Sequence, residues 1–196
     1  MKRAAINFFG EEPGEPYIQK KPFVEKFYLG ELGRLFGKQI VEFLGIDALM
    51  VITTKLTEID KLGAYSISSG GIPSIEPSSQ SGYSNDWEDY LVYFIRDYAP
   101  FLNKGQLDKL IDEMLYSKVQ VLQRLAIHFI RENFSEFSDK WWSYIASADK
   151  DTALHIHEPY ELLRKYSPEF TEEQFERTIN WIEKINPLDT YELEEN

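Results

Sequence analysis

The chain of 196 residues contains no cysteine. Disulfide bonds, thiolate nucleophiles and zinc sites with cysteine ligands are therefore excluded. No apolar run approaches the roughly 20 residues that a membrane-spanning helix needs. The apolar run after Met1-Lys2-Arg3 is also too short for a secretory signal. We therefore expect a cytoplasmic protein that has no membrane partner.

Positive charge is scarce as well. The sequence has 21 Lys and Arg residues against 33 Asp and Glu residues, which gives a net charge of -12. An acidic surface repels phosphate backbones, so we expect no nucleic-acid partner. Aromatic residues, in contrast, reach 15% and hydrophobic residues 43%. This composition predicts a folded core with large aromatic contacts or an aromatic interaction surface.

The clearest local signals are two helix starts. Thr171 and Gln174 have the spacing of a capping box, and Phe170 and Phe175 occupy the two positions of a hydrophobic staple. The same pattern occurs at Asn103-Lys104-Gly105-Gln106. After the later start, apolar residues recur at helical spacing and predict the stripe of the last helix: Phe175, Ile179, Ile182 and Ile185.

Helical spacing continues through most of the remaining chain. It predicts a helix over about 32–44 that Gly45 ends, and a second over about 47–62, where spacing and length outweigh the strand propensity of Met50–Thr54. The face of the first helix carries Leu32, Leu35, Phe36, Ile40 and Phe43. Further helices are expected after the cap residues Asn85 and Asn103, over 119–130 and 137–145, and from Pro159 to Ser167-Pro168.

Three parts of the chain do not follow this pattern. Residues 1–22 are rich in Gly, Pro and charge and predict an irregular segment, and 187–196 read as an acidic tail. Between them, the helical array over 23–186 is interrupted by a Ser-, Gly- and Pro-rich loop at 64–84. This loop is either a flexible surface loop or an ordered loop that packs on the helices through Ile67, Ile72, Ile75 and Tyr83.

Short capped helices with one apolar stripe each must stack on one another to bury that stripe. The predicted fold class is therefore all-α, with stacked helical hairpins and one long irregular loop. Stacks of helix pairs expose extended surfaces that usually bind other molecules. The terminal helices of such a stack keep an apolar face unless something covers it.

Several segments carry a family resemblance, namely 122–131, 157–163, 170–174 and 179–182, with the loop residues Ile72-Pro73-Ser74-Ile75-Glu76 ahead of a helix. Together they resemble the degenerate HEAT-like α-solenoid regions of large bacterial multidomain proteins, many of which carry a nucleotide-binding signalling module and act in anti-phage defence. The resemblance covers about residues 72–185. It implies a solenoid fragment that recognises a protein partner or a neighbouring domain.

One cluster has the side chains of a metal site. His155, His157 and Glu158 could together bind zinc or iron. The other interpretation is that His157 and Glu158 cap a helix start, where a carboxylate also suits the helix dipole. We expect the capping role, and hence no bound metal or other cofactor. His128 lies within an apolar stripe and is expected to be a hydrogen-bonded packing residue.

The remaining candidates are interaction residues. Trp141 and Trp142 are adjacent and must diverge on a helix, so one should face solvent, a second helix layer or a partner. We expect that one of them is left turned outward. Arg124 and Arg131 are seven residues apart and share a helix face, where they either bridge to an acidic neighbouring helix or contact an anionic ligand. Tyr83 and His157 complete the candidate interaction set.

These observations predict a non-enzymatic scaffold for protein–protein recognition, with self-association as one form of it. The resemblance places the scaffold in a bacterial defence assembly, as a sensor part. The alternative is a small helical metal-dependent hydrolase that uses His155, His157 and Glu158.

Overall fold

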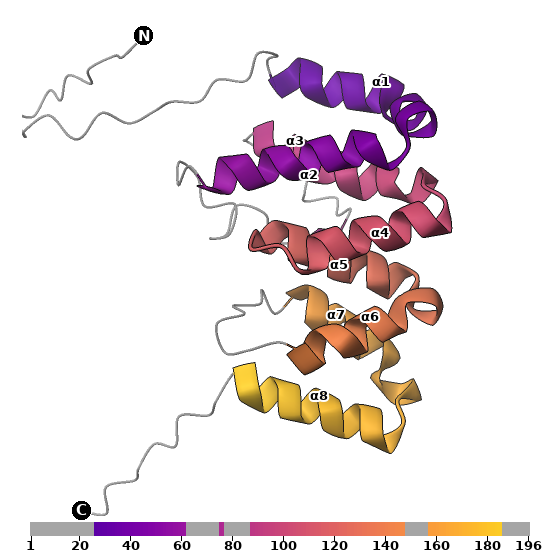
Figure 1. Ribbon diagram of the computed structural model, residues 1–196, viewed down its shortest axis with the longest axis vertical. Helices are drawn as coiled ribbons and strands as arrows, with labels where there is room; N and C mark the ends of the chain where they lie inside the picture. The colour runs from indigo at the N-terminus through magenta and orange to yellow at the C-terminus, as the bar shows by residue number, and fades with distance from the viewer. Residues whose placement is uncertain (1–25, 62–74, 77–86, 148–156, 186–196) are drawn as a thin grey trace, which may run out of the picture.

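The computed structural model describes residues 26–61, 75–76, 87–147 and 157–185 (Figure 1). Eight α-helices and no strand are present within these ranges, which confirms the all-α prediction. The helices are α1 (Lys26–Leu44), α2 (Ile46–Lys61), α3 (Trp87–Tyr98), α4 (Lys104–Leu115), α5 (Gln120–Glu132), α6 (Phe134–Ser147), α7 (His157–Tyr166) and α8 (Glu172–Ile185). Two single-turn 3₁₀ helices, η2 (Ala99–Phe101) and η3 (Ser167–Glu169), follow α3 and α7. The segments predicted over 1–22 and 187–196, most of the 64–84 loop and the Asn85 cap lie outside the described residues.

The helices follow one another along the longest axis of the molecule, with α1 at one end and α8 at the other (Figure 1). Odd-numbered helices pack on each other in sequence, α1 on α3, α3 on α5 and α5 on α7. Even-numbered helices do the same, from α2 through α4 and α6 to α8. None of the described helices combines the length and the apolar composition that a membrane span requires.

Local sequence signals define three of the helix ends. The Asn103 side chain accepts a hydrogen bond from the Gln106 amide at 3.0 Å, and the Gln106 side chain accepts one from the Asn103 amide. Thr171 and Gln174 form the same reciprocal pair at the start of α8, so both capping boxes are confirmed. Gly45 ends α1 with a φ of 62°, a left-handed conformation that glycine adopts without steric cost.

The core is centred on α5. Ten of its 13 residues are buried, and it packs against α3, α4, α6 and α7. The largest side chains with almost no exposure include Trp141, Phe129, Met114, Leu115 and Leu122. Their burial is the main source of stability in this part of the chain.

Helix α1 packs with a glycine face rather than with its apolar stripe. Among the residues of this helix whose burial the structure describes, Gly33, Gly37 and Val41 are buried. A Cβ atom on Gly33 would lie 3.3 Å from the Phe94 ring of α3, and one on Gly37 would overlap the Tyr98 ring. Glycine therefore allows the α1 backbone to approach the α3 aromatics closely, and the bulky apolar side chains of α1 point elsewhere.

Helix α8 is anchored by a residue outside its predicted stripe. The expectation that Phe175 packs as a staple residue is wrong, since its side chain is 53% exposed. Trp181 is the buried aromatic of α8, at 4% exposure, and its ring meets that of Trp141 edge-on at 5.4 Å. The aromatic contact to α6 thus selects which face of α8 turns inward.

The two adjacent tryptophans of α6 do diverge, but neither faces solvent. Trp141 is 0% exposed and contacts Trp181, while Trp142 is 8% exposed and meets the Phe170 ring at 4.9 Å. The expectation of an outward tryptophan is wrong because Trp181 of α8 packs on Trp141 and Phe170 packs on Trp142. The alternative that a second helix layer receives them is the one observed.

Candidate functional site

A buried ion pair joins the middle of α5 to the start of α7. The Arg124 guanidinium donates two hydrogen bonds to Glu158, from Nε and Nη2, both at 2.8 Å. The two side chains are 2% and 3% exposed. Such a bidentate pair fixes both the distance and the orientation of the two helices. Of the two alternatives for Arg124, the bridge to an acidic neighbouring helix is therefore the one observed.

Residue Ile75 docks on this ion pair from the 64–84 loop, of which the structure describes Ile75 and Glu76. Its side chain is 0% exposed. Its amide donates to Glu158 Oε1 at 3.2 Å, and its carbonyl accepts from Arg96 Nη1 at 3.2 Å. Ile75 therefore connects α3 with α7, and at this residue the loop is ordered and packed, as one of the two interpretations predicted.

Glu76 continues the contact toward the end of α5. Its carboxylate accepts from Arg131 and lies 3.3 Å from His128 Nδ1. Arg131 also donates to Glu132 at 2.8 Å, and its carbonyl accepts from the Tyr166 hydroxyl at 2.8 Å. The predicted role of His128 as a hydrogen-bonded packing residue is confirmed.

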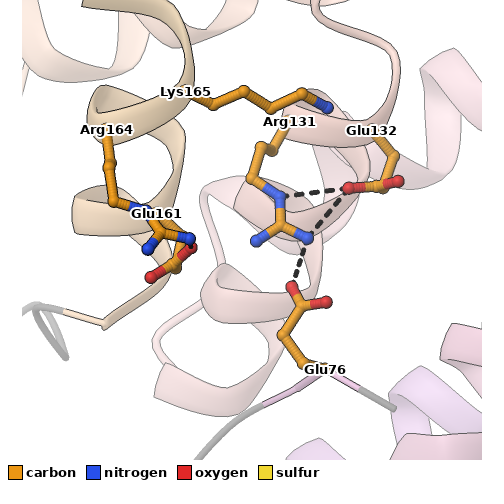
Figure 2. Close-up of a pocket in the computed structure, with 6 residues that line it drawn as sticks. All are labelled: Glu76, Arg131, Glu132, Glu161, Arg164 and Lys165. Atoms are coloured by element: carbon orange, nitrogen blue, oxygen red, sulfur yellow. Dashed lines mark hydrogen bonds and ion pairs between the residues drawn. The ribbon is translucent and has the colours of Figure 1, made fainter. Parts of the chain in front are cut away.

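An open pocket of about 480 Å³ lies beside these contacts. Figure 2 shows Arg131 bonded to the carboxylates of Glu76 and Glu132, with Arg164 and Glu161 of α7 on the other side and the Lys165 side chain extending from α7 toward Arg131. Arg164 is bonded to Glu161 of its own helix at 2.6 Å. The pocket is lined by three carboxylates and three cations, and this balance gives it no strong preference for an anion or a cation.

The protonation equilibria follow from this arrangement. Burial tends to raise the pKa of Glu158, but the hydrogen bonds and charge of Arg124 with the Ile75 amide outweigh it, so the pKa lies below its ordinary value. Burial lowers the pKa of His128, and Glu76 only partly counteracts that effect. Glu158 is thus held as a carboxylate, and His128 is held neutral at physiological pH.

The proposed metal cluster has little support in this geometry. Both carboxylate oxygens of Glu158 face Arg124, and one of them also accepts from Ile75. His157 opens α7 half-buried, and His155 lies outside the described residues. Within the described ranges no three His, Asp or Glu side chains are grouped as metal ligands would be. The helix-start position predicted for His157, Glu158 and Pro159 is the one observed.

The terminal helices expose the other notable surface. On α1 the exposed large apolar side chains are Tyr28, Leu32, Leu35, Phe36, Ile40, Phe43 and Leu44, with Phe43 at 89% exposure. We call this set the α1 face. On α8 they are Phe175, Ile179 and Ile182, at 53%, 39% and 39%, which we call the α8 face. The expected apolar end at α1 is thus present among the described residues.

The structure places the sequence candidates differently. Arg124 and Arg131 of α5 form ion pairs with Glu158 and Glu76, respectively, and Trp141 and Trp142 are core residues. His157 lies at the start of α7, and Tyr83 falls outside the described residues. The sequence did not predict Glu76 as the acidic partner of His128, because the two residues are 52 positions apart and no local spacing pattern indicates their contact.

No protein-family model, curated protein or solved structure matches this chain.

Proposed function

We propose that the chain is a HEAT-like array of helix pairs that works as a scaffold for protein–protein recognition, without catalysis. The α1 and α8 faces are its binding surfaces. In such an array each helix pair contacts only its neighbours, and among the described residues no helix precedes α1 or follows α8 to cover these ends. Contiguous exposed apolar side chains on a folded protein mark interaction sites.

The observation that carries this proposal is the contrast between inner and terminal helices. Helix α5 buries Leu122, Leu125 and Phe129 completely or almost so. The terminal helices leave side chains of the same chemistry exposed, including Phe36 at 51% and Phe175 at 53%. Exposed aromatic side chains are frequent anchors of binding energy when a partner buries them.

The inner contacts support a structural rather than a catalytic role. Glu158, the most buried carboxylate near the pocket, is bonded to Arg124 and Ile75. Arg131 is shared between Glu76 and Glu132. An enzyme keeps its acid or base available to a substrate, whereas these groups hold helices and one another. The resemblance to defence-protein solenoids further suggests a partner in an anti-phage assembly.

Site-specific crosslinking in the native cells tests the proposal. A photo-crosslinking amino acid would replace Phe43 in one variant and Phe175 in another. A matched control would carry it at Glu113, which is exposed on α4 in the middle of the array. We expect the two end positions to crosslink to protein, a second copy of this chain included, and the control to give none.

Two results would contradict the scaffold. One is the absence of crosslinked protein at both end positions. The other is turnover of a generic ester, phosphoester or nucleotide by the purified chain, because a binding scaffold has no such activity.

A further inference from the structure

We infer that the occupant of each end is a second copy of this chain, bound head-to-tail so that the α1 face of one copy covers the α8 face of the next. The inference rests on the proposed function and names its partner. The two faces lie at opposite ends of the molecule (Figure 1), so they cannot cover each other within one chain.

The first argument is the charge beside the α8 face. Phe175, Ile179 and Ile182 share one side of the helix. Glu172, Glu176 and Glu183 are each three or four residues from a member of this face, so they form an acidic row along one edge of it. The whole helix carries four glutamates against one arginine and one lysine.

The second argument is the charge on α1. This helix carries three basic residues against two acidic ones, in a chain whose net charge is -12. Lys38 is three residues from Leu35 of the α1 face and is 53% exposed. Its ion-pair partner, Glu42, belongs to the same helix, and exposed pairs of this kind contribute only about 0.3–0.5 kcal/mol. Lys38 can therefore exchange that partner for an acidic row on another molecule.

These charges select one of three possible pairings. Contact between two α8 faces would bring two acidic rows together, and contact between two α1 faces would bring together two helices with an excess of positive charge. Like charges brought together at an interface disfavour the complex. Contact between the α1 and α8 faces joins apolar surface to apolar surface and opposite charges at the rim.

The contact is heterologous, so it leaves one face of each kind exposed on every dimer. Such contacts propagate into open chains unless the rotation between copies closes a ring. The mean mass in solution should consequently rise with protein concentration instead of stopping at a dimer. High salt should weaken the association, because the rim charges are solvent-exposed.

Complementation between two variants tests this geometry. Phe43→Glu disables the α1 face and Phe175→Glu disables the α8 face, and both side chains are more than half exposed, so folding should be retained. Tyr116→Glu is the matched control, since Tyr116 is 59% exposed but lies at the end of α4, away from both faces. Sedimentation velocity would be measured over a concentration series, with circular dichroism as the check on folding.

We expect wild type and Tyr116→Glu to form open-ended oligomers and each end variant alone to be monomeric. An equimolar mixture of the two end variants should give one species of about twice the 23.0 kDa chain mass and nothing larger. That outcome is specific to head-to-tail contact, because each variant supplies the face that the other lacks.

Other results overturn the inference. Dimers of Phe175→Glu alone would show contact between α1 faces, and dimers of Phe43→Glu alone would show contact between α8 faces. Wild type that stays monomeric at the highest concentration would also overturn it. The scaffold itself would survive that last result if the end positions still crosslinked to a different protein, and it would fail with the inference if they crosslinked to none.

Discussion

At the scale of single residues, the Arg124–Glu158 pair dominates the interior. Removing one partner of a buried ion pair leaves the other charge buried and uncompensated, which typically lowers the free energy of unfolding by about 3–5 kcal/mol. Here the stranded carboxylate would keep only the Ile75 amide as a partner among the contacts described above. The pair therefore ties the stability of α5, α7 and the Ile75 contact together.

We expect Arg124→Met to lower the free energy of unfolding by about 3–5 kcal/mol, measured by urea denaturation. Arg164→Met is the matched control, because Arg164 is 64% exposed and pairs with Glu161 of its own helix. Its effect should stay within about 0.5 kcal/mol. Equal effects of the two substitutions would contradict the role given to the buried pair.

A second residue-scale prediction concerns pH and His128. Burial lowers its pKa in the folded state below the ordinary value of 6.5, despite the neighbouring carboxylates of Glu76 and Glu132, and the Arg131 charge lowers it further. The unfolded chain therefore binds a proton more readily, so this residue's contribution to stability is complete above pH 6.5 and is lost as the pH falls.

Denaturation midpoints at pH 7.5 and 5.5 would measure this effect. Wild type should lose more stability between these values than His128→Gln, whose amide does not titrate and can still hydrogen-bond to Glu76. A variant with the same pH dependence as wild type would show that His128 is not the titrating group.

At the scale of helices, α1 and α3 test whether close backbone approach matters. Gly37→Ala should gain about 1 kcal/mol of helix propensity, but the new methyl group would overlap the Tyr98 ring. We expect the overlap to dominate and the variant to lose about 1–3 kcal/mol.

Gly105→Ala in α4 is the matched control for Gly37→Ala. The nearest heavy atom to its added Cβ would be Asn103 Oδ1 at 3.6 Å, an ordinary contact. This substitution should be neutral or stabilising by up to about 1 kcal/mol. Thermal denaturation of both variants gives the comparison, and a Gly37→Ala protein as stable as the control would refute close packing of α1 on α3.

These helices also show what a sequence can predict. The capping boxes at Asn103 and Thr171 and the stop at Gly45 depend on residues a few positions apart, so local spacing predicted them. Which face of a helix turns inward depends on its neighbours. Trp181 replaces Phe175 as the anchor of α8 because Trp141 lies opposite it, and no local rule contains that contact.

The same reasoning applies to the candidate site. Arg124 and Glu158 were both candidate site residues in the sequence. They are 34 residues apart, however, and nothing in their spacing predicted that they form an ion pair. Glu158 was therefore considered as a metal ligand instead. The apolar face of α1 could be predicted, since it is a property of one helix, but its glycine contact with α3 could not.

At the scale of the whole molecule, the question is how many helices are destabilised by a substitution in one of them. Within the odd-numbered series, and likewise within the even-numbered series, each helix packs on the one before it. Helix α5 packs against α3, α4, α6 and α7. In an array stabilised by nearest neighbours, local opening should be easiest at the ends and hardest at the centre. A single cooperative core would instead open as one unit.

Hydrogen exchange distinguishes these two behaviours. In wild type we expect the slowest exchange in α4 and α5 and faster exchange in α1 and α8. Trp181→Ala removes a buried ring that contacts α6, a change that typically costs about 3–5 kcal/mol. It should accelerate exchange in α8 and α6 and leave α1 to α3 as in wild type. Arg124→Met acts at the centre, through which both halves are connected, and should accelerate exchange in every helix. If Trp181→Ala also accelerated α1 to α3, the molecule would unfold as one unit, and the proposed array of semi-independent helix pairs would be wrong.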